Sequence, residues 1–512
     1  MHMPCNLNRF SRLIGCWLFL SAVVIACSAG GDDEATPTGH AALTDVTTNY
    51  GTVYRRELTA EELSGLLEPV VQAKVDYSGN LHLAFFTRGR DLDTSALPAG
   101  HDLIANPMRF QINHLVWSTI GGSVLLQERL DPAPPHSFTT PVDPSDSGID
   151  NCLLLGLGLS ILGDPVVVYQ GGNRAEFTTG QDCNPQFQGD LMVSTRTGGI
   201  WQEYLGIQGD NSAKNPMHPD GTVGMSGDVA VDAQGNIHMI AQHFAEWCDQ
   251  NAMNHPDLLY VQQTPADLGN YTTALEEPVD QVNLYGTGGG VQSAMGYHCR
   301  LILDHGDPQQ PIVFYEGSRS NGDRQLRAAF REEGRWRIET IHTIADDFVV
   351  NFISPAISQD GTIGVAYFLE RTNLVAGELG DHLMYAQRRV DEDGNISWDN
   401  IDVDIQSFCG NYCALAFDHY NLPAIAYYDE RPYTPYRERH NAKLAYLVRQ
   451  EWGQDWQKEN VAFHGRIGLY NALWFDGNNI PYVVSYEREQ IENSDEELHS
   501  IVVFRRDRQL SR

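Results

Sequence analysis

The sequence predicts an all-β fold, a seven-bladed β-propeller of four-stranded antiparallel blades in which the amino-terminal strand closes the last blade. Three observations lead to this prediction. A strand–turn–strand pattern occurs seven times along the 512 residues, at intervals of 54 to 84 residues. Each copy is followed by apolar sequence for further strands, as a four-stranded propeller blade requires. The last copy lacks a fourth strand, whereas a spare strand precedes the first copy.

Each copy of the pattern is centred on a tight turn between two apolar runs. The first turn residues are Asp76, Ser160, Asp232, Asp304, Ser358, Asp418 and Asp476, and the residues three places on are Gly79, Gly163, Gly235, Asp307, Gly361, Asn421 and Asn479. An Asp or Ser side chain can bond to the turn backbone, and Gly, Asn or Asp tolerates the left-handed conformation that reverses the chain. We therefore expect a hairpin between strands A and B of every blade.

The ends of the chain predict how the ring closes. The last copy offers only three strands, which are Tyr470–Phe475, Pro481–Tyr486 and His499–Phe504. We expect Thr52–Leu58 to supply the fourth, because pairing the two chain ends in one blade removes exposed sheet edges. The alternative is an eight-bladed ring with a degenerate blade in the 84-residue interval between the first two copies.

The amino-terminal segment is predicted to direct export. Arg9 and Arg12 precede an apolar stretch over residues 13–26, which has the length of a secretory signal core and is too short to span a bilayer as a mature helix. We therefore assign residues 1–26 to a cleaved signal peptide.

A lipid anchor is predicted next to this signal. The residues Val-Ile-Ala-Cys at 24–27 resemble the lipobox of bacterial lipoproteins. The resemblance implies that Cys27 carries lipid, and that Ser28 favours the outer membrane of a Gram-negative bacterium. An ordinary secretory signal is the alternative. Residues 27–50 are then a flexible tether, and residues 51–512 form the propeller.

The composition is that of a globular protein with an acidic surface. Hydrophobic residues make up 42% of the chain and charged residues 20%, with a formal net charge of -33 at pH 7. A nucleic-acid partner is excluded because there is no basic stripe to neutralise phosphates. We expect a monomer that contacts the membrane only through its anchor. No cofactor is expected; calcium is the one ion considered, although the acidic run Asp391–Asn395 is more simply a hairpin.

A family resemblance is carried by three segments of the sixth copy. These are Cys413–Asp418, Ala424–Asp429 and Lys443–Tyr446. They resemble the tandem repeats of bacterial secreted propellers that are described as sialidase-like. The resemblance implies the propeller fold and an exported protein. It does not imply sialidase activity, because the chain lacks the pattern Ser-x-Asp-x-Gly-x-Thr-Trp.

Arginines recur at one end of the predicted ring, where strands B and C are connected and where long loops occur near residues 87–111, 171–190 and 243–257. Six copies carry an arginine 12 to 15 residues after the turn: Arg88, Arg174, Arg319, Arg371, Arg431 and Arg488. Several follow an acid, namely Glu316, Glu370, Glu430 or Glu487. A ring of arginines favours an anionic ligand such as an acidic glycan. The alternative is that each arginine pairs with an acid of the neighbouring blade.

The third copy departs from this pattern. It carries His243, Glu246 and Trp247 where other copies carry arginine, and Tyr297 and His298 follow in the connection to the next blade. A histidine, a tyrosine and a carboxylate could perform proton abstraction or general acid/base hydrolysis on a sugar. The alternative is a structural role in loops.

Six cysteines remain in the mature chain, an even number that suggests disulfides in an exported protein. Their order favours Cys152 with Cys183, Cys248 with Cys299, and Cys409 with Cys413. Metal ligation by these thiols is the alternative.

Two histidines, His82 and His238, occupy equivalent places near the start of strand B. We interpret them as packing positions of the blade and not as a metal-binding pair.

The sequence thus predicts an outer-membrane lipoprotein that acts as a ligand-binding propeller, with an acidic glycan or a surface protein as partner. The alternative is a carbohydrate-active enzyme, either a polysaccharide lyase or a glycoside hydrolase. A structural lipoprotein assisting a surface complex is a third possibility. Fold alone does not choose among them.

Overall fold

The computed structural model describes most of the chain from residue 48 onward. The described residues are 48–63, 70–88, 110–130, 154–171, 190–207, 221–245, 256–270, 273–281, 295–318, 323–345, 347–371, 380–405, 409–429, 441–446, 456–462, 466–490 and 497–510. They belong to one compact unit, Thr48–Arg512. The predicted signal peptide and Cys27 lie outside the described residues. Among the helices of the described part, none has the length and apolar character needed to cross a membrane.

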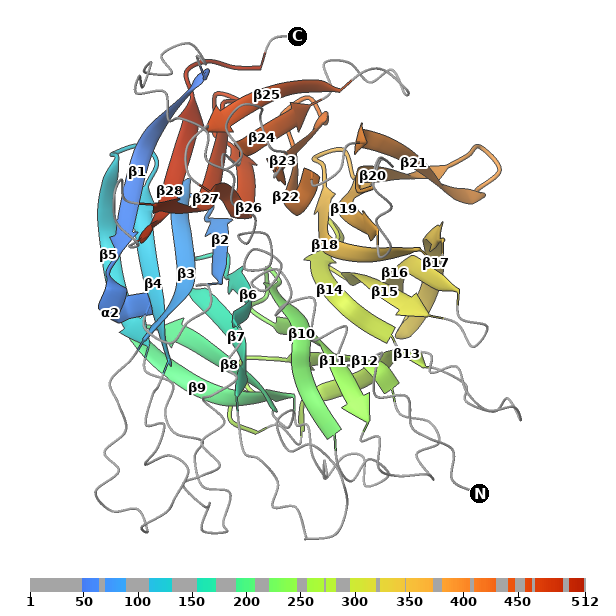
Figure 1. Ribbon diagram of the computed structural model, residues 1–512. Helices are drawn as coiled ribbons and strands as arrows, with labels where there is room; N and C mark the ends of the chain where they lie inside the picture. The colour runs from blue at the N-terminus through green and yellow to red at the C-terminus, as the bar shows by residue number, and fades with distance from the viewer. Residues whose placement is uncertain are drawn as a thin grey trace, which may run out of the picture. The chain divides into compact units, whose positions relative to one another are not determined.

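Seven four-stranded antiparallel sheets surround a central axis (Figure 1). In six of them the four strands follow the order of the chain, so that strand A is innermost and strand D outermost. The seventh sheet has the order β1-β28-β27-β26, in which the first strand of the chain pairs with the last. The predicted seven-bladed propeller, closed by its amino-terminal strand, is confirmed.

The strands take four positions in the blades, which we number 1 to 7 from β2 onward. The A strands are β2 (Val71–Val75), β6 (Leu154–Leu159), β10 (Gly221–Val231), β14 (Met295–Leu303), β18 (Phe348–Ile357), β22 (Cys409–Phe417) and β26 (Arg466–Phe475). The B strands are β3 (Asn80–Arg88), β7 (Pro165–Gly171), β11 (Ile237–Ala245), β15 (Pro311–Ser318), β19 (Ile363–Arg371), β23 (Pro423–Asp429) and β27 (Pro481–Gln490). The C strands are β4 (Phe110–Ser118), β8 (Asp190–Thr197), β12 (Pro256–Gln263), β16 (Arg324–Glu332), β20 (His382–Val390), β24 (Asn441–Tyr446) and β28 (Glu497–Arg506). The D strands are β5 (Ser123–Leu130), β9 (Ile200–Ile207), β13 (Leu275–Gln281), β17 (Arg335–Ile344), β21 (Ile396–Ile405), β25 (Gln457–Ala462) and β1 (Tyr50–Leu58), and the short helix α2 (Ala60–Leu63) follows β1.

The ring closes within residues 48–512. The A strands contact one another in chain order, and β26 also contacts β2. Strand β1 pairs with β28 from Tyr50 opposite Arg506 to Leu58 opposite His499. The predicted role of Thr52–Leu58 is therefore confirmed, with two further residues at the start of the strand. Because all seven sheets and the closing pair lie in this segment, it contains everything that the fold requires.

The turns between strands A and B have the predicted chemistry in six blades. In blade 1, the Asp76 carboxylate accepts hydrogen bonds from the backbone N–H groups of Ser78 and Asn80, both at 2.8 Å, and Gly79 has a φ of 80°. Blade 4 differs. There the N–H of Asp304 bonds to the carbonyl of Gln310, so the turn is two residues longer, and the predicted left-handed conformation at Asp307 was wrong.

The hairpin predicted for Asp391–Asn395 is confirmed. It is closed by the same kind of aspartate turn, in which the Asp391 carboxylate accepts the N–H groups of Asp393 at 3.0 Å and Asn395 at 2.7 Å.

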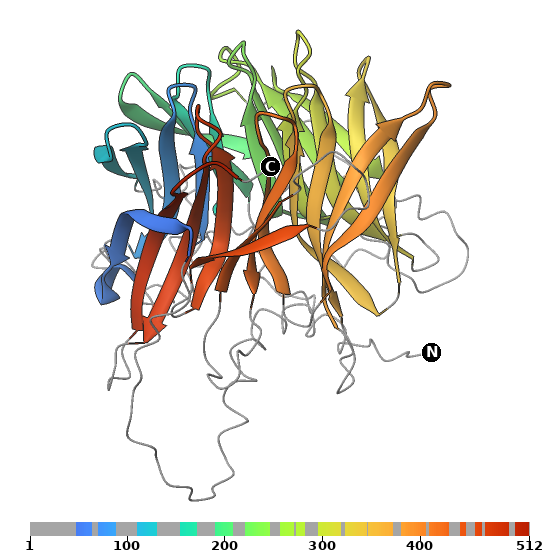
Figure 2. The same ribbon diagram turned by 90° about the horizontal axis from the view of Figure 1, so that it is seen from above.

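The blades have two distinct ends. The A–B and C–D turns gather at one end, which we call the turn end, and they form the upper edge in Figure 2. The B–C and D–A connections lie at the other end, the loop end. The long loops predicted near residues 87–111, 171–190 and 243–257 fall between strands B and C of blades 1, 2 and 3, at the loop end.

Neighbouring blades are fastened by a repeated ion pair. A glutamate on strand D of one blade meets an arginine on strand C of the next, with an aromatic residue beside it. The four sets are Glu128 with Arg196 and Trp201, Glu277 with Arg331 and Trp336, Glu339 with Arg388 and Trp398, and Glu459 with Arg506 and Tyr50. Both side chains of each pair are mostly buried, so these contacts fix the register between blades.

Candidate functional site

Four successive A strands carry the same irregularity near the loop end. In each, a bulky residue has a φ of about 50°, and the pairing with strand B shifts register beside it. The four residues are His298 in β14, Phe352 in β18, Tyr412 in β22 and Tyr470 in β26. This conformation costs a bulky side chain about 1–3 kcal/mol. Its recurrence marks the loop end of the axis in blades 4 to 7 as a specialised region.

Three of these residues form a continuous aromatic row. The ring centres of Phe352 and Tyr412 are 4.3 Å apart, and those of Tyr412 and Tyr470 are 4.9 Å apart. Neighbouring strands hold the bulges in place: Cys413 Sγ donates to the Phe352 carbonyl at 2.7 Å, and Asn471 Nδ2 donates to the Tyr412 carbonyl at 3.1 Å. All three rings are only half-buried. We call Phe352, Tyr412 and Tyr470 the aromatic row.

Blade 4 replaces aromatic residues of this series with ionisable ones. His298 takes the place of the row residue, and Glu316 takes the place of the aromatic residue that backs the row in the next three blades, Phe368, Tyr428 or Tyr486. Burial raises the pKa of Glu316 to about 7, although the guanidinium of Arg324 at 3.5 Å opposes it. Burial also lowers the pKa of His298 to about 4, and Arg300 adds to this effect. At neutral pH the histidine is uncharged and the carboxyl is partly protonated.

Arg300 supplies a cation beside this group. Its Nη1 donates to the carbonyl of Cys299 at 3.0 Å, and within the described part of the chain no carboxylate lies at ion-pair distance from it. The residue is half-buried on the innermost strand β14. Its charge also acts on the Cys413 thiol two blades away, opposing the burial that raises the pKa of that thiol to about 12. The guanidinium is therefore close to the axis.

These groups together suit a sugar ligand. The faces of a half-exposed aromatic row can stack on apolar sugar faces, and a guanidinium fork can hold a carboxylate or a sulfate. A neutral histidine and a carboxyl group with a pKa near 7 are also a base and an acid at physiological pH. Ionisable residues whose surroundings shift their pKa values strongly, as at His298 and Glu316, mark candidate functional sites.

The predicted arginine ring is described only in part. Arg174, Arg319 and Arg431, and the side chain of Arg88, lie outside the described residues. Arg371 Nε is 3.2 Å from Asp347 Oδ2, and Arg488 Nη2 is 2.8 Å from Glu497 Oε2. Each of these two pairs lies within or beside its own blade and is not an interblade pair of the kind that the alternative predicted. Among the described residues, interblade ion pairs include those between the glutamates of strand D and the arginines of strand C.

The acids predicted to accompany the arginines do not occupy equivalent places. Tyr297 faces Glu316 across the A–B ladder, whereas Val349 faces Glu370 and Ile467 faces Glu487 at positions nearer the loop end. Glu430 lies outside the described residues. The pattern seen in the sequence therefore does not translate into a ring of equivalent acids.

The predicted catalytic residues are divided between two blades. His243 lies on β11 and Tyr297 on β14, but their side chains, and all of Glu246, lie outside the described residues. His298 is the one whose surroundings are described, and it lies next to Arg300 and in the aromatic series. The residues that the sequence did not single out are Arg300 and the aromatic row.

Two of the predicted disulfides are not formed. Cys409 and Cys413 are four residues apart on one strand, a separation of about 13 Å in extended chain, whereas bridged cysteines need about 4.4–6.8 Å between Cα atoms. Cys299 is a free, buried thiol in contact with the Ser226 hydroxyl at 3.4 Å, so its predicted pairing with Cys248 was also wrong. Cys152, Cys183 and Cys248 lie outside the described residues, and the Cys152–Cys183 pairing stays a prediction.

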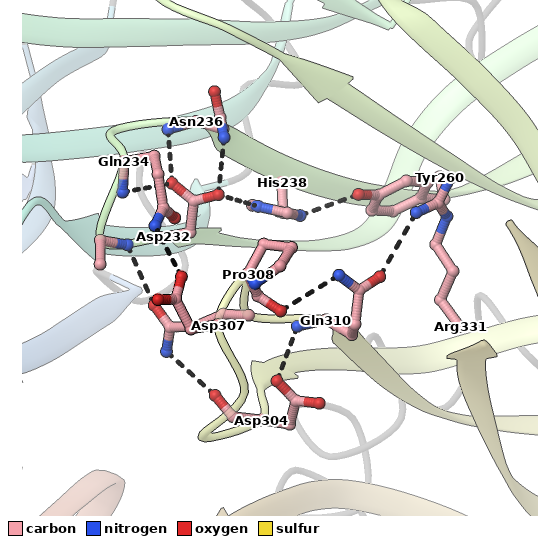
Figure 3. Close-up of polar contacts among 12 residues, drawn as sticks. Asp232, Gln234, Asn236, His238, Tyr260, Asp304, Asp307, Pro308, Gln310 and Arg331 are labelled. Atoms are coloured by element: carbon pink, nitrogen blue, oxygen red, sulfur yellow. Dashed lines mark hydrogen bonds and ion pairs between the residues drawn. The ribbon is translucent and has the colours of Figure 1, made fainter. Parts of the chain in front are cut away.

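His82 and His238 lie at the turn end, away from the aromatic row. His238 Nε2 is 3.1 Å from Asp232 Oδ2, and its Nδ1 is 2.8 Å from the hydroxyl of Tyr260; all three residues are buried (Figure 3). His82 makes the corresponding contacts with Asp76 at 3.4 Å and with His114 at 3.1 Å. Burial lowers the pKa of both histidines. The prediction that they are packing positions is confirmed.

A sequence signal for the aromatic row did exist. His298, Phe352, Tyr412 and Tyr470 each lie six residues before the first turn residue of their copy. Aligning the copies on the turn would have brought out an aromatic column with a histidine at its head. The bulge that follows it has no sequence signature of its own, because it is bulky residues, and not glycine, that adopt the positive φ.

Comparison with known proteins shows the fold. No family model and no curated protein sequence matches the chain. Among solved structures, an ulvan lyase, a polysaccharide lyase bound to -[GlcA(1-4)Rha3S]-, has a TM-score of 0.50 and 12% identity, covering 88% of this chain and 96% of that one. A protein of unknown function from Dyadobacter fermentans has a TM-score of 0.41 and 11% identity, covering 69% and 94%. The Hadza microbial sialidase Hz136 has a TM-score of 0.39 and 12% identity, covering 74% and 70%. At these identities the likeness is one of propeller fold.

Proposed function

We propose that the protein binds an acidic glycan at the loop end of the axis. The observation that carries this proposal is the aromatic row beside Arg300, a half-buried guanidinium with no carboxylate at ion-pair distance among the described residues. Exposed arginines are normally paired or fully hydrated, so a cation held at the axis favours an anionic ligand. The strained bulges hold the rings in fixed positions, which limits the entropy lost on binding.

The fold comparison supports the glycan class. The propeller with a TM-score of 0.50 acts on a polysaccharide and was solved with a chain of GlcA and Rha3S units. Because the identity is 12%, no residue role is transferred from it. The chemistry proposed for this chain therefore depends on its own residues.

A second candidate function is catalysis on the same glycan. It is favoured by His298 and Glu316, whose pKa values of about 4 and about 7 leave a neutral base and a partly protonated acid in one blade at pH 7. Glycoside hydrolysis normally needs two carboxyl groups flanking the scissile bond, whereas lyase chemistry needs a base that removes a proton from the sugar ring. Of the two reactions, the described residues suit the lyase better.

Binding can be tested on the propeller with matched variants. We would measure affinity for polyuronates and sulfated polysaccharides against neutral polysaccharides, for the wild type, Arg300→Met, Tyr412→Ala and Arg371→Met. Loss of a charge-assisted hydrogen bond costs about 1.5–3 kcal/mol, so Arg300→Met should weaken acidic-glycan binding about 10- to 100-fold. Arg371→Met is the control, since that arginine at the same end already contacts Asp347. Equal loss in both arginine variants, or no binding by the wild type, would count against the proposal.

The same samples test catalysis. New unsaturated sugar ends, followed by ultraviolet absorbance, would show a lyase, and new reducing ends without unsaturation would show a hydrolase. His298→Gln should abolish either product while acidic-glycan binding persists. Binding without any product leaves the binding function alone.

We also propose that lipid on Cys27 attaches the protein to the outer membrane. The order of charge, apolar stretch, small residue and cysteine at residues 9–27 supports this. Incorporation of labelled palmitate should occur in the wild type and be lost in Cys27→Ala. Equal labelling of both would exclude this site.

A further inference from the structure

The turn end of blades 1 and 2 exposes large apolar side chains. Tyr77 is 85% exposed, Ile120 90%, Leu162 85% and Ile200 66%. They occupy four different turns, which are the A–B and C–D turns of the two blades. Exposed apolar residues are ordinary when scattered singly, but a group of them on adjacent turns marks an interaction surface. We call Tyr77, Ile120, Leu162 and Ile200 the apolar tips.

The tips belong to one continuous surface. A side chain at Gly163 in the A–B turn of blade 2 would lie 3.3 Å from the Asp76 carboxylate in the A–B turn of blade 1. Within blade 1, the Thr119 hydroxyl of the C–D turn donates to the Gly79 carbonyl of the A–B turn at 2.5 Å. Strands β2 and β6, which lead into the two A–B turns, also contact each other. Tyr77, Ile120 and Leu162 therefore project from turns that touch one another, and Ile200 projects from the C–D turn of the same blade as Leu162.

This surface is low in charge for a chain with a net charge of -33. The four turns, residues 76–79, 118–123, 160–164 and 197–200, contain two charged residues, Asp76 and Asp164. The Asp76 carboxylate is turned inward, bonded to Ser78 and Asn80. By contrast, the C–D turns of blades 4 and 5 carry five acids, namely Glu332, Glu333, Asp391, Glu392 and Asp393. Repulsion from an anionic surface is therefore weaker at the apolar tips than at the C–D turns of blades 4 and 5.

The described chain also begins at this end. Tyr50 pairs with Arg506 at the end of β28, and the side chain of Gln509 donates to the carbonyl of Asn478 in the A–B turn of blade 7. Blade 7 is the neighbour of blade 1. The 47 residues that precede Thr48 include the apolar stretch 13–26 and Cys27. A flexible tether of 20 residues spans about 25 Å, so an anchor at Cys27 would keep the turn end near the bilayer.

We propose that the lipid anchor, which the sequence predicts as the sole membrane contact, is joined by a second contact: the apolar tips of blades 1 and 2 rest on a lipid bilayer, entering its interfacial layer. The start of the described chain favours lipid over a protein partner, because Tyr50 lies at the turn end and the lipid anchor proposed at Cys27 is a short tether away in the sequence. Blades 1 and 2 then form the contact, and the loop end with the aromatic row and Arg300 faces away from the membrane. This arrangement leaves the proposed glycan site open to polymers outside. The membrane proposal does not depend on glycan binding, because it concerns the opposite end of the propeller.

Vesicle flotation tests the proposal directly. Residues 48–512 hold the complete ring, so this segment can be used without the anchor, with neutral phosphatidylcholine vesicles as the probe. The test variant carries Tyr77→Ser, Ile120→Ser, Leu162→Ser and Ile200→Ser. The control variant carries Val390→Ser and Tyr420→Ser, which are 56% and 58% exposed on turns of blades 5 and 6. Unchanged thermal unfolding would show that all three proteins are folded, as expected for exposed positions.

The wild type should float with the vesicles, and the test variant should bind about tenfold less or weaker still. The control should stay within about twofold of the wild type. Wild-type protein that stays in solution would overturn the proposal, as would equal binding by wild type and test variant. Light scattering decides the remaining case: if the wild type dimerises and the test variant is monomeric, the tips are a surface between copies of the chain and the lipid proposal is wrong.

Discussion

Glu316 allows a stability prediction whose size and pH dependence follow from its position. The residue is 6% exposed, in a place that blades 5, 6 and 7 fill with an aromatic ring. Burial raises its pKa from the usual 4.5 to about 7, and Arg324 at 3.5 Å reduces this effect without cancelling it. Replacing it by glutamine keeps the shape and removes the ionisation. We therefore predict that Glu316→Gln stabilises the protein at high pH and leaves it unchanged at low pH.

The sign follows from proton linkage. Between pH 4.5 and about 7 the folded protein keeps a proton on Glu316 that the unfolded chain has released, so stability falls as pH rises through this range. Below 4.5 both states are protonated, and above about 7 both are ionised. The interval corresponds to about 3 kcal/mol of folding free energy. For the 465 residues of Thr48–Arg512, each kcal/mol moves Tm by about 1 °C.

Thermal unfolding of wild type and Glu316→Gln at pH 4 and pH 8 is the measurement. The Tm of the variant should match the wild type at pH 4 and exceed it by about 3 °C at pH 8. Glu497→Gln is the control, because that carboxylate is 35% exposed and pairs with Arg488 at the surface. It should change Tm by less than about 1 °C at both pH values. An advantage of Glu316→Gln that is the same at pH 4 and pH 8 would refute the reasoning.

Two further predictions concern the contacts between and within blades. The Glu339 carboxylate accepts three hydrogen bonds from Arg388 and one from the Trp398 indole at 2.8 Å. Glu339→Ala should therefore lower Tm by about 3 °C, whereas the control Glu497→Ala should lower it by less than about 1 °C. Equal losses of Tm would contradict the role assigned to buried interblade pairs. His114 has a pKa of about 3 because of burial and the nearby His82, and Tyr260 fills the same place in blade 3. Below about pH 6.5 His114 binds a proton in the unfolded chain but stays neutral in the folded protein, so the wild type loses stability as pH falls. The Tm of His114→Tyr relative to wild type should therefore rise as pH falls from 7 to 4. A Tm difference that does not depend on pH would exclude His114 protonation as its cause.

The fold was readable from the sequence because it depends on local chemistry that repeats. Asp76 and Gly79 define a turn wherever they recur, and alternation of apolar residues defines the strands on each side. The closing strand could be predicted for a different reason: the last blade has only three strands, and the spare strand predicted at Thr52–Leu58 is the one that can complete it. The prediction failed for the A–B turn of blade 4, because that turn has two more residues than the turns of the other blades.

The candidate site could be predicted only in part, because the register of strand pairing determines which residues a charged side chain contacts. Arg371 and Arg300 look alike in the sequence, yet the first meets Asp347 and the second meets a backbone carbonyl. Glu316 and Glu370 each precede a loop, but the pairing of the A and B strands sets them at different levels. The sequence shows which residue types are present in a blade. The bulges that decide which of them face the axis arise from contacts between blades.

The coupling between those bulges explains why the aromatic row favours a binding role. The Phe352 backbone is held by Cys413 of the next blade, and the Tyr412 backbone by Asn471 of the blade after that. A strained residue persists only where its surroundings fix it, and here the next blade fixes the backbones of Phe352 and Tyr412. Strain of about 1–3 kcal/mol per bulge is retained at four positions whose side chains are half-buried, and Phe352, Tyr412 and Tyr470 pack against the margin of core clusters while part of each ring stays exposed. A purely structural ring could avoid that cost with a small residue such as Ser226, which lies six residues before the turn of blade 3. The retained strain is better explained if the aromatic row is a rigid binding surface that is already formed before a ligand binds.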